Sequence, residues 1–372
     1  MIIAYYWLTM GPYHYARMNA VQNHSKCSHL HVIEATDTDD HAWNLFPQKN
    51  FSHNVLQEGQ MLDNSVVKTA SSQLVEAVTG GPCDVLVNGA GYFHLSMLKP
   101  LMKLKRRGIK IVLWSESTEH DQDRMAGKEM IKSLVLKIYD GAIVAGETHK
   151  NYLVKLGMNP DSICEVGNVV DNSYFEDHKE YERRGFIYVG RFLDIKNLER
   201  LILAYQSYRK KCKADNLKPE PLVLVGDGPT KYEIERKVQT LALKDVEFKG
   251  RLQIDQVKKQ YAKSKVLILP SLSEPWGLVI NEGMASGLAI IASEKCGAAP
   301  ALVNHGENGF IFNPLDADEL AERMLQLTNE GGLAQKFGDI SMDIIKQYSP
   351  DVYARRCCGF FKDIVETSQT EV

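Results

Sequence analysis

The sequence predicts two doubly wound parallel α/β sheets, one after the other along a chain of 372 residues. Short apolar runs alternate with segments whose apolar residues recur at helical spacing, such as Asn197–Lys211 and Lys231–Leu243. This alternation is typical of strand–helix–strand units, which build parallel sheets that hold ligands at the carboxyl ends of their strands. The length is sufficient for two domains that each have a full hydrophobic core.

The expected strands are the short apolar runs, each of which has the length of a buried parallel strand. In the first half of the chain they are Ile2–Leu8, Leu30–Glu34, Asp84–Asn88, Ile109–Ser115 and Gly141–Ala145. In the second half they are Phe186–Gly190, Leu222–Gly226, Val246–Gly250, Val266–Pro270, Ala289–Ala292 and Phe310–Asn313.

A polar and strongly charged segment, Asp171–Arg184, separates the two series of strands. We interpret it as the join and expect an N-terminal domain over residues 1–172 and a C-terminal domain over residues 180–348. The stretch Ser349–Glu366 has helical periodicity and follows the second sheet. Two facing domains of this kind form a cleft, which is the default place for a binding site.

The composition is that of an ordinary globular protein, with 44% hydrophobic and 24% charged residues. A formal net charge of −3 gives no reason to expect a nucleic-acid partner. The seven cysteines include no C-x2-C pair, so neither a zinc site nor a disulfide framework is predicted, and the odd number fits a reducing cytoplasm. No apolar run approaches the roughly 18 residues needed to cross a bilayer, so we expect a cytoplasmic protein that is at most peripheral to a membrane.

The most informative segment is Ser271–Gly287, SLSEPWGLVINEGMASG, which follows an apolar strand. Its Gly-containing turn opens a helix, whose N-terminal N–H groups and dipole stabilise a phosphate. Glu274 lies on the loop before the helix and Glu282 lies about two turns into it. The two carboxylates can therefore contact different parts of one ligand, with a phosphate between them.

A second group of residues follows the strand that ends at Gly190. Arg191 comes directly after it and Lys196 lies at the start of the next helix. Two cations at a strand end suit a diphosphate, although the same residues also occur in a solvated loop. The turn Gly226–Gly228 has two interpretations as well, because its glycines permit close approach of a ligand but equally build a plain connecting loop.

The order of these motifs resembles that of the GT-B-fold glycosyltransferases of family four, a retaining, nucleotide-sugar-dependent family also called glycosyl transferases group 1. The motifs are G-R…K-N from Gly190, V-G-D-G-P, G-R-L from Gly250, and P-S-x-x-E-P-W-G-L-V-x-x-E-x-M-A-x-G from Pro270. The resemblance covers most of Gly167–Asp316. It implies two facing Rossmann-like domains, with the C-terminal helix over residues 349–372 packing back on the first.

The resemblance also implies roles for the charged residues. Arg191 and Lys196 would bind the donor diphosphate and stabilise the negative charge of the leaving group. Glu274 would face the hydroxyls of the donor sugar, a hexose carried by UDP or GDP. Glu282 would accept hydrogen bonds from the ribose. Fixed positive donors aimed at a departing diphosphate stabilise the transition state directly.

The remaining donor contacts implied by the resemblance are mostly made by backbone groups. The N–H groups of Gly277, Leu278 and Val279 would lie near the β-phosphate, and Arg251 and Leu252 would frame the base. Members of the family are usually retaining and need no tightly bound metal. We therefore expect no cofactor besides the nucleotide-sugar, and an acceptor that is a glycan, a lipid-linked molecule or a small molecule.

A metal-dependent transferase would need an Asp-x-Asp motif, and the chain has three. They are Asp37–Asp39, Asp121–Asp123 and Asp316–Asp318. None clearly follows a strand, so we interpret them as surface or helix-capping residues.

The first half of the chain is less informative. The family places paired glycines after the first strand, near the diphosphate and acceptor, whereas this chain has Gly11 followed by proline. We expect close approach of a ligand at Gly11, and Arg17 is a candidate contact to an acceptor or a phosphate. Gly89 and Gly91 indicate either a loop that lines the site or a tight turn.

Many members of the family carry a histidine near the donor sugar, after the strand that here ends at Ser115. In this chain either Glu116 takes that place or His120 reaches it from the following loop, and we favour Glu116.

The segment Leu95–Lys110 mixes apolar residues with lysine and arginine. It indicates either a surface that contacts anionic lipid or the cationic end that helices ordinarily prefer. Two alternatives to a transferase are a catalytically silent sugar-nucleotide or glycan-binding subunit and a reversible sugar phosphorylase or synthase.

Overall fold

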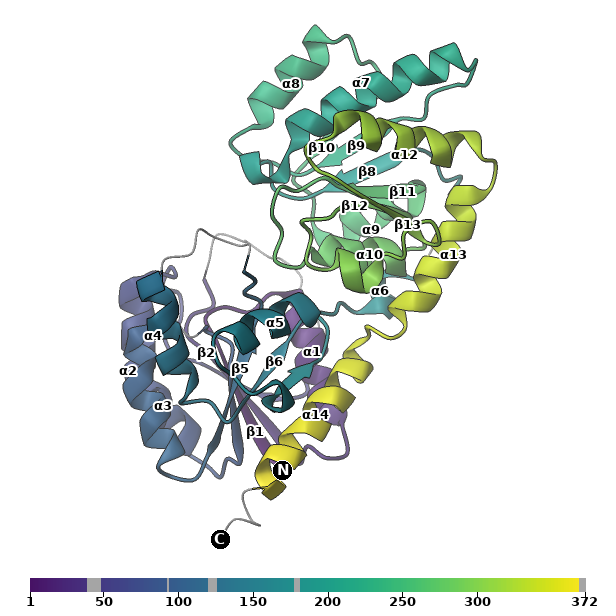
Figure 1. Ribbon diagram of the computed structural model, residues 1–372. Helices are drawn as coiled ribbons and strands as arrows, with labels where there is room; N and C mark the ends of the chain where they lie inside the picture. The colour runs from purple at the N-terminus through teal and green to yellow at the C-terminus, as the bar shows by residue number, and fades with distance from the viewer. Residues whose placement is uncertain (39–47, 92–93, 120–125, 177–180, 368–372) are drawn as a thin grey trace. The chain divides into compact units, whose positions relative to one another are not determined.

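The computed structural model describes residues 1–38, 48–91, 94–119, 126–176 and 181–367 (Figure 1). The chain divides into two compact units. Unit 1 consists of Met1–Val170 together with Ser349–Val372, and unit 2 consists of Asp171–Tyr348. None of the helices in the described ranges is long and apolar enough to cross a membrane.

Unit 1 contains a parallel sheet of seven strands in the order β3-β2-β1-β4-β5-β6-β7. The strands are β1 (Ile2–Trp7), β2 (His29–Glu34), β3 (Ser52–Val55), β4 (Val85–Asn88), β5 (Lys110–Ser115), β6 (Gly141–Val144) and β7 (Ile163–Glu165). The direction of winding reverses between β1 and β4. In a doubly wound sheet this reversal point is where ligands bind.

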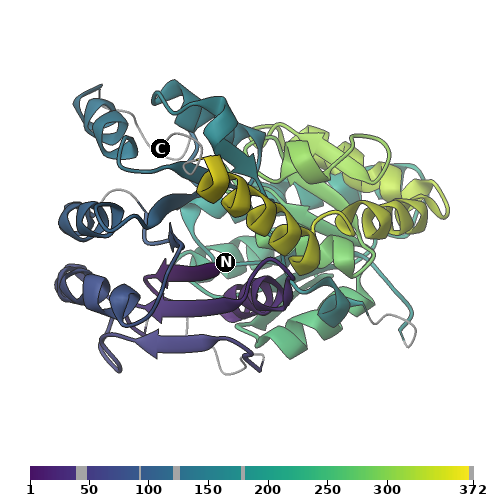
Figure 2. The same ribbon diagram turned by 90° about the horizontal axis from the view of Figure 1, so that it is seen from below.

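Helices cover both faces of the first sheet (Figures 1 and 2). They are α1 (Pro12–Asn23), α2 (Asn64–Thr79), α3 (Leu98–Lys105), α4 (Ala126–Leu136), α5 (Glu147–Lys155) and α14 (Pro350–Thr367), with short 3₁₀ turns at Leu95–Met97 and Pro160–Ser162. The core below α2, α3, α4 and α5 includes Tyr6, Leu74, Leu101 and Leu113. On the other face α14 packs against α1, so the first and last segments of the chain share one layer.

Unit 2 contains a parallel sheet of six strands in the order β10-β9-β8-β11-β12-β13. The strands are β8 (Phe186–Val189), β9 (Leu222–Val225), β10 (Val246–Gly250), β11 (Val266–Leu269), β12 (Ala289–Ser293) and β13 (Gly309–Phe312). Its helices are α6 (Asn172–Phe175), α7 (Leu198–Ala214), α8 (Lys231–Thr240), α9 (Ile254–Lys263), α10 (Leu278–Ala285), α11 (Ala299–Leu302), α12 (Ala317–Asn329) and α13 (Leu333–Ile345), with a 3₁₀ turn at Asp194–Lys196. Here the winding reverses between β8 and β11.

Every strand predicted from the sequence is present, and the fold class of two doubly wound parallel sheets is confirmed. The sequence did not predict β3 and β7. Both are the outermost strands of the first sheet. The β3 sequence, Ser-His-Asn-Val, is polar because an edge strand is only partly buried and therefore carries no continuous apolar run.

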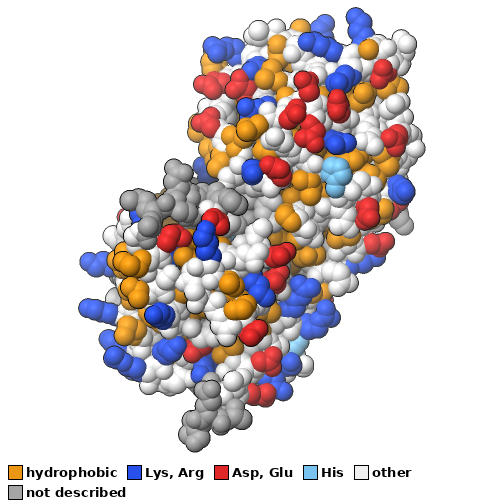
Figure 3. Space-filling view, viewed as in Figure 1, with side chains coloured by type: hydrophobic (Ala, Val, Ile, Leu, Met, Phe, Trp, Pro, Cys, Tyr) orange, Lys and Arg blue, Asp and Glu red, His pale blue; other side chains and the backbone are white. Residues whose placement is uncertain are grey.

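One side of unit 1 exposes apolar and basic side chains together. Helix α3 buries Leu101 and Leu104 and turns Met102 outward, 43% exposed. On α4, Met130, Ile131 and Leu134 are 63%, 51% and 57% exposed. Figure 3 shows orange and blue side chains interspersed on the side of unit 1 formed by these helices. We call the exposed residues of α3 and α4 the α3–α4 surface.

Candidate functional site

The reversal point of the second sheet brings together two groups of residues that are far apart in the sequence. Strands β8 and β11 are paired, so the loops that follow them leave the sheet side by side. Lys196, after β8, forms an ion pair with Glu274, after β11. Their side chains are 19% and 14% exposed, so the pair is partly shielded from solvent. The structure thus joins the basic motif to the acidic motif.

Asn197 holds these loops in place. Its backbone has a φ of 59°, a left-handed conformation that is uncommon for a residue other than glycine. Its side-chain Nδ2 donates hydrogen bonds to the carbonyl oxygens of Pro270, at 3.0 Å, and Pro314, at 2.8 Å. One buried amide therefore ties the loop after β8 to the ends of β11 and β13, which fixes the position of the neighbouring Lys196.

The loop that carries Glu274 is braced by the loop after β12. The Glu274 N–H donates to the Lys295 carbonyl at 3.2 Å, and the Gly297 N–H donates to the Glu274 carbonyl at 2.9 Å. The buried Trp276 donates from its indole Nε1 to Asn281 Oδ1 at 2.9 Å. The main chain around Glu274 is consequently fixed on both sides, and its carboxylate has a defined direction.

Gly277 begins α10 in a conformation that requires glycine. Its φ is 98°, and a Cβ atom there would lie 2.8 Å from Leu269 Cδ2. Leu278 and Val279 follow in the first turn of α10, where backbone N–H groups have no acceptor within the helix. These N–H groups and the helix dipole make the start of α10 suitable for a phosphate.

Glu282 lies in the second turn of α10 and is only 3% exposed. Its Oε2 accepts a hydrogen bond of 2.6 Å from the hydroxyl of Tyr261 on α9. No sequence motif identified Tyr261 as part of the site. The one available signal was its spacing of four from Val257, which places both on the buried side of α9. Tyr261 orients a carboxylate that is predicted to bind ribose.

The glycines at the strand ends allow two loops to touch. A Cβ atom on Gly226, whose φ is 142°, would lie 1.8 Å from the carbonyl oxygen of Gly190. Close contact between the loops after β8 and β9 therefore explains Gly226 without a ligand. The side chain of Arg191 is exposed, and no described residue pairs with its guanidinium. Arg251 is exposed and Leu252 is partly buried after β10.

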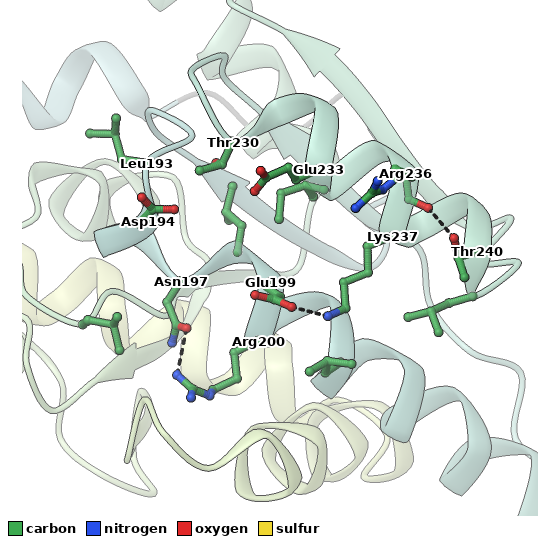
Figure 4. Close-up of a pocket in the computed structure, with 15 residues that line it drawn as sticks. Leu193, Asp194, Asn197, Glu199, Arg200, Thr230, Glu233, Arg236, Lys237 and Thr240 are labelled. Carbon is green, nitrogen blue, oxygen red and sulfur yellow. Dashed lines mark hydrogen bonds and ion pairs between the residues drawn. The ribbon is translucent and has the colours of Figure 1, made fainter.

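A groove of about 840 Å³ lies between α7 and α8 (Figure 4). The ion pair between Lys237 and Glu199 links the two helices there, and Arg200 Nη1 donates to Asn197 Oδ1 at 3.1 Å. No residue that the sequence analysis assigned to the donor lines this groove. We therefore treat it as separate from the Lys196–Glu274 pair.

In unit 1, Gly11 is the N-cap of α1 with a φ of −102°, so its conformation does not itself require glycine. The Gly11 N–H donates to His14 Nδ1 at 3.0 Å. Glu34, 3% exposed, holds the preceding loop by accepting from the Met10 N–H at 2.6 Å and from His53 at 2.8 Å. No sequence motif indicated this role for Glu34.

The side chain of Glu116 is partly buried after β5, where Oε1 accepts a hydrogen bond of 2.6 Å from Asn168 Nδ2. His120, the alternative to Glu116, lies outside the described residues. Of the Asp-x-Asp motifs, Asp316 is the N-cap of α12 and accepts from two backbone N–H groups. Asp39 and the motif Asp121–Asp123 also lie outside the described residues.

Comparison with known proteins identifies the family. Residues 171–341 match the family model described as glycosyl transferases group 1, a match that spans the whole Lys196–Glu274 site. This segment belongs to that family. The resemblance seen in the sequence is confirmed.

Two curated relatives and one solved structure illustrate the similarity. The sulfoquinovosyl transferase of Arabidopsis thaliana is 30% identical over 45% of this chain and 31% of its own length. The N-acetyl-alpha-D-glucosaminyl L-malate synthase of Bacillus anthracis is 30% identical over 52% of this chain and 50% of its own length. The chain thus spans a third to a half of these relatives. HepE of Anabaena, solved with UDP, covers 100% of both chains at 15% identity and a TM-score of 0.72, which shows a shared fold.

Proposed function

We propose that the protein is a retaining glycosyltransferase that moves a hexose from a UDP- or GDP-sugar to a glycan, lipid-linked or small-molecule acceptor. The observation that carries this proposal is the ion pair between Lys196 and Glu274 at the reversal point of the second sheet. A cation and a carboxylate beside the start of a helix match two parts of a nucleotide-sugar, because the cation and the helix start suit the diphosphate and the carboxylate suits the sugar hydroxyls. Two relatives support it, one named as a sulfoquinovosyl transferase and the other as an N-acetyl-alpha-D-glucosaminyl L-malate synthase.

The ion pair has a direct role in the proposed reaction. In the free protein Glu274 and Lys196 neutralise each other. A bound diphosphate attracts Lys196 and Arg191, which releases Glu274 to accept hydrogen bonds from the sugar hydroxyls. As the glycosidic bond breaks, negative charge grows on the diphosphate and positive charge on the sugar ring. The two cations and the first N–H groups of α10 then stabilise the leaving group.

The other residues of the site complete the proposed donor contacts. Glu282, oriented by Tyr261, accepts hydrogen bonds from the ribose, and Arg251 and Leu252 contact the base. Glu116 faces the donor sugar from unit 1, and Gly11 allows the diphosphate or acceptor to approach. The cations and the helix dipole supply the positive charge, so we propose that no metal or other cofactor is required.

Nucleotide release tests this function. Purified protein is incubated with UDP-, GDP- and ADP-sugars in the presence of EDTA, and the freed nucleotide is measured. We expect slow hydrolysis of one donor, and a product whose anomeric configuration is retained in the proton NMR spectrum. Glu274→Gln should abolish release, whereas Glu294→Gln, which alters an exposed carboxylate of the same unit, should leave it unchanged.

The negative outcomes of this experiment are informative. If no donor is hydrolysed and free UDP, GDP and ADP fail to raise the melting temperature, the donor site is refuted and the glycan-binding form of the silent-subunit alternative leads. Activity that requires added Mg²⁺ or Mn²⁺ refutes metal independence alone.

We further propose that the α3–α4 surface contacts an anionic membrane at the cytoplasmic face. Lys99 and Lys103 are exposed on α3 beside Met102, Arg106 is exposed at the C-cap of that helix, and α4 adds three exposed apolar side chains. Cations attract anionic headgroups, and apolar side chains enter the interface. The protein should bind vesicles that contain phosphatidylserine and should not bind vesicles of pure phosphatidylcholine. Its binding should weaken as salt is added and in the variant Lys103→Glu. Equal sedimentation with both vesicle types would refute the surface.

A further inference from the structure

A buried cation that has no anionic partner among the described residues lies at the reversal point of the first sheet. Arg17 on α1 is 2% exposed, and its guanidinium lies 5.5 Å from the ring centre of Trp114. Its Nε donates to the Tyr13 carbonyl at 3.2 Å. Its Nη1 is buried with no hydrogen-bond partner in the described part of the chain, and none of those residues forms an ion pair with it. Burying such a charge unpaired is costly.

A second buried donor belongs to Trp7, which packs against the same Trp114 ring as Arg17. The indole Nε1 of Trp7, at the end of β1, is buried and has no acceptor among the described residues. Trp7 is 3% exposed and packs 6.0 Å from Trp114, ring centre to ring centre. A Cβ atom on Gly89 would lie 2.1 Å from the Trp7 ring, so the glycine after β4 provides room for the indole. Two buried donors therefore lie near the carboxyl ends of β1 and β4, where the direction of winding reverses.

His14 adds a neutral side chain to the same place. Its ring lies 4.6 Å from that of Trp7. Burial, with a smaller contribution from Arg17, lowers the pKa of His14 to about 3. Because Nδ1 accepts from the Gly11 N–H, the ring proton resides on Nε2. The surroundings thus offer hydrogen-bond donors, aromatic faces and one permanent positive charge, which is the chemistry that recognises an oxyanion.

We propose that Arg17 and Trp7 bind an anionic group, a carboxylate or a phosphate, of the acceptor. That the anionic group belongs to an acceptor rests on the proposed transferase function, whereas anion binding by Arg17 and Trp7 does not. The donor diphosphate carries the same chemistry and is the alternative source of the anion. Since Nη1 and Nε1 are enclosed in the unliganded protein, binding involves a rearrangement of a neighbouring segment.

The first test measures anion binding without any transferase activity. The variant Arg191→Met/Lys196→Met removes the cations of the donor site, and its melting temperature is followed with inorganic phosphate against chloride at equal ionic strength. We expect a rise of about 3 °C or more at tenfold excess over the dissociation constant. Adding Arg17→Met or Trp7→Phe should remove or reduce the rise, and adding Arg355→Met, an exposed arginine of α14, should not. A rise that survives Arg17→Met, or no rise at all, overturns the proposal.

Stability without ligand separates a binding role from a structural one. An unpaired buried guanidinium destabilises the free protein, so Arg17→Met should melt at or above the wild-type temperature while losing the response to phosphate. If Arg17 only packs on Trp114, the variant melts lower and the phosphate response is unchanged, which refutes the proposal.

The source of the anion is decided by two titrations. If the acceptor supplies it, Arg17→Met binds UDP with wild-type affinity in calorimetry. Its KM for acceptors that carry a carboxylate or phosphate then rises about 10- to 100-fold, and its KM for uncharged acceptors is unchanged. Loss of UDP affinity instead assigns Arg17 to the donor diphosphate and overturns the acceptor assignment. The phosphate test stands even if no transferase activity is found.

Discussion

Replacing Gly226 by alanine should disrupt the donor site through a backbone collision. The added Cβ atom would lie 1.8 Å from the Gly190 carbonyl oxygen, whereas real Cβ contacts do not fall below 3.0 Å, so the loops must separate by at least 3.0 − 1.8 = 1.2 Å. A side chain at a φ of 142° costs about 1–3 kcal/mol, and forced backbone shifts cost about as much. We therefore expect a loss of roughly 4 kcal/mol in the free energy of unfolding of unit 2.

The collision should also affect catalysis, because Arg191 directly follows Gly190. A displacement of about 1 Å at a positioning group costs on the order of 100-fold in rate. Hydrogen exchange of the β8 and β9 amides measures the stability of unit 2, and nucleotide release measures the rate. Gly306→Ala is the matched control, since its φ is 86° but nothing lies within 4 Å of its added Cβ. It should cost about 1 kcal/mol and leave release unchanged. If Gly226→Ala is as stable as this control and releases nucleotide at the wild-type rate, the close contact of the two loops is refuted.

The remaining predictions concern single side chains. Tyr261→Phe should lower the free energy of unfolding by about 1–3 kcal/mol and weaken nucleotide binding, because it leaves the buried Glu282 one donor short. Urea unfolding measures the stability and calorimetry measures the nucleotide affinity, and an unchanged affinity would refute the positioning role. Glu274→Gln should keep the fold and lose transfer, as judged by circular dichroism and nucleotide release. The pKa of His14 is about 3 in the folded protein and 6.5 in the unfolded chain, so the unfolded state binds a proton at a higher pH than the folded state does. The stability that neutral His14 contributes is therefore present above pH 6.5 and is lost as the pH falls toward 3. His14→Gln should flatten this pH dependence of the melting temperature, and an identical slope would contradict it. Asp316→Ala should cost about 0.5–2 kcal/mol by removing the α12 cap, without changing the rate of nucleotide release; a lost rate would mean that this motif serves the reaction.

The sequence predicted the strands well, because buried parallel strands are continuous apolar runs and those runs are visible without a structure. The same argument explains the failure at β3, whose polar residues lie at an edge. The meeting of Lys196 with Glu274 was predictable in kind, since both follow strands whose carboxyl ends share one edge. The order of the strands, which makes β8 and β11 neighbours, came only from the structure.

The supporting residues were harder to predict because their partners are distant in sequence. Tyr261 reaches a carboxylate on another helix, and Asn197 bonds to Pro270 and Pro314 through a left-handed turn. No local pattern reports such contacts. Arg17 shows a different limit. Its place after the first strand made it a candidate contact, but burial of its charge depends on Trp114, which lies on a strand much later in the chain.

The position of α14 has a consequence for how the protein is made. Unit 1 is built from both ends of the chain, and Tyr353 and Phe361 of α14 complete its core against Tyr5 of the first strand. The ribosome therefore begins unit 1 before unit 2 but supplies the last helix of unit 1 only after all of unit 2 has been made. Unit 2, uninterrupted over Asp171–Tyr348, can fold on the ribosome while the earlier-made unit 1 still lacks its last helix. A polypeptide that stops before Ser349 would present an uncovered apolar layer, so only chains that include α14 can bury both cores.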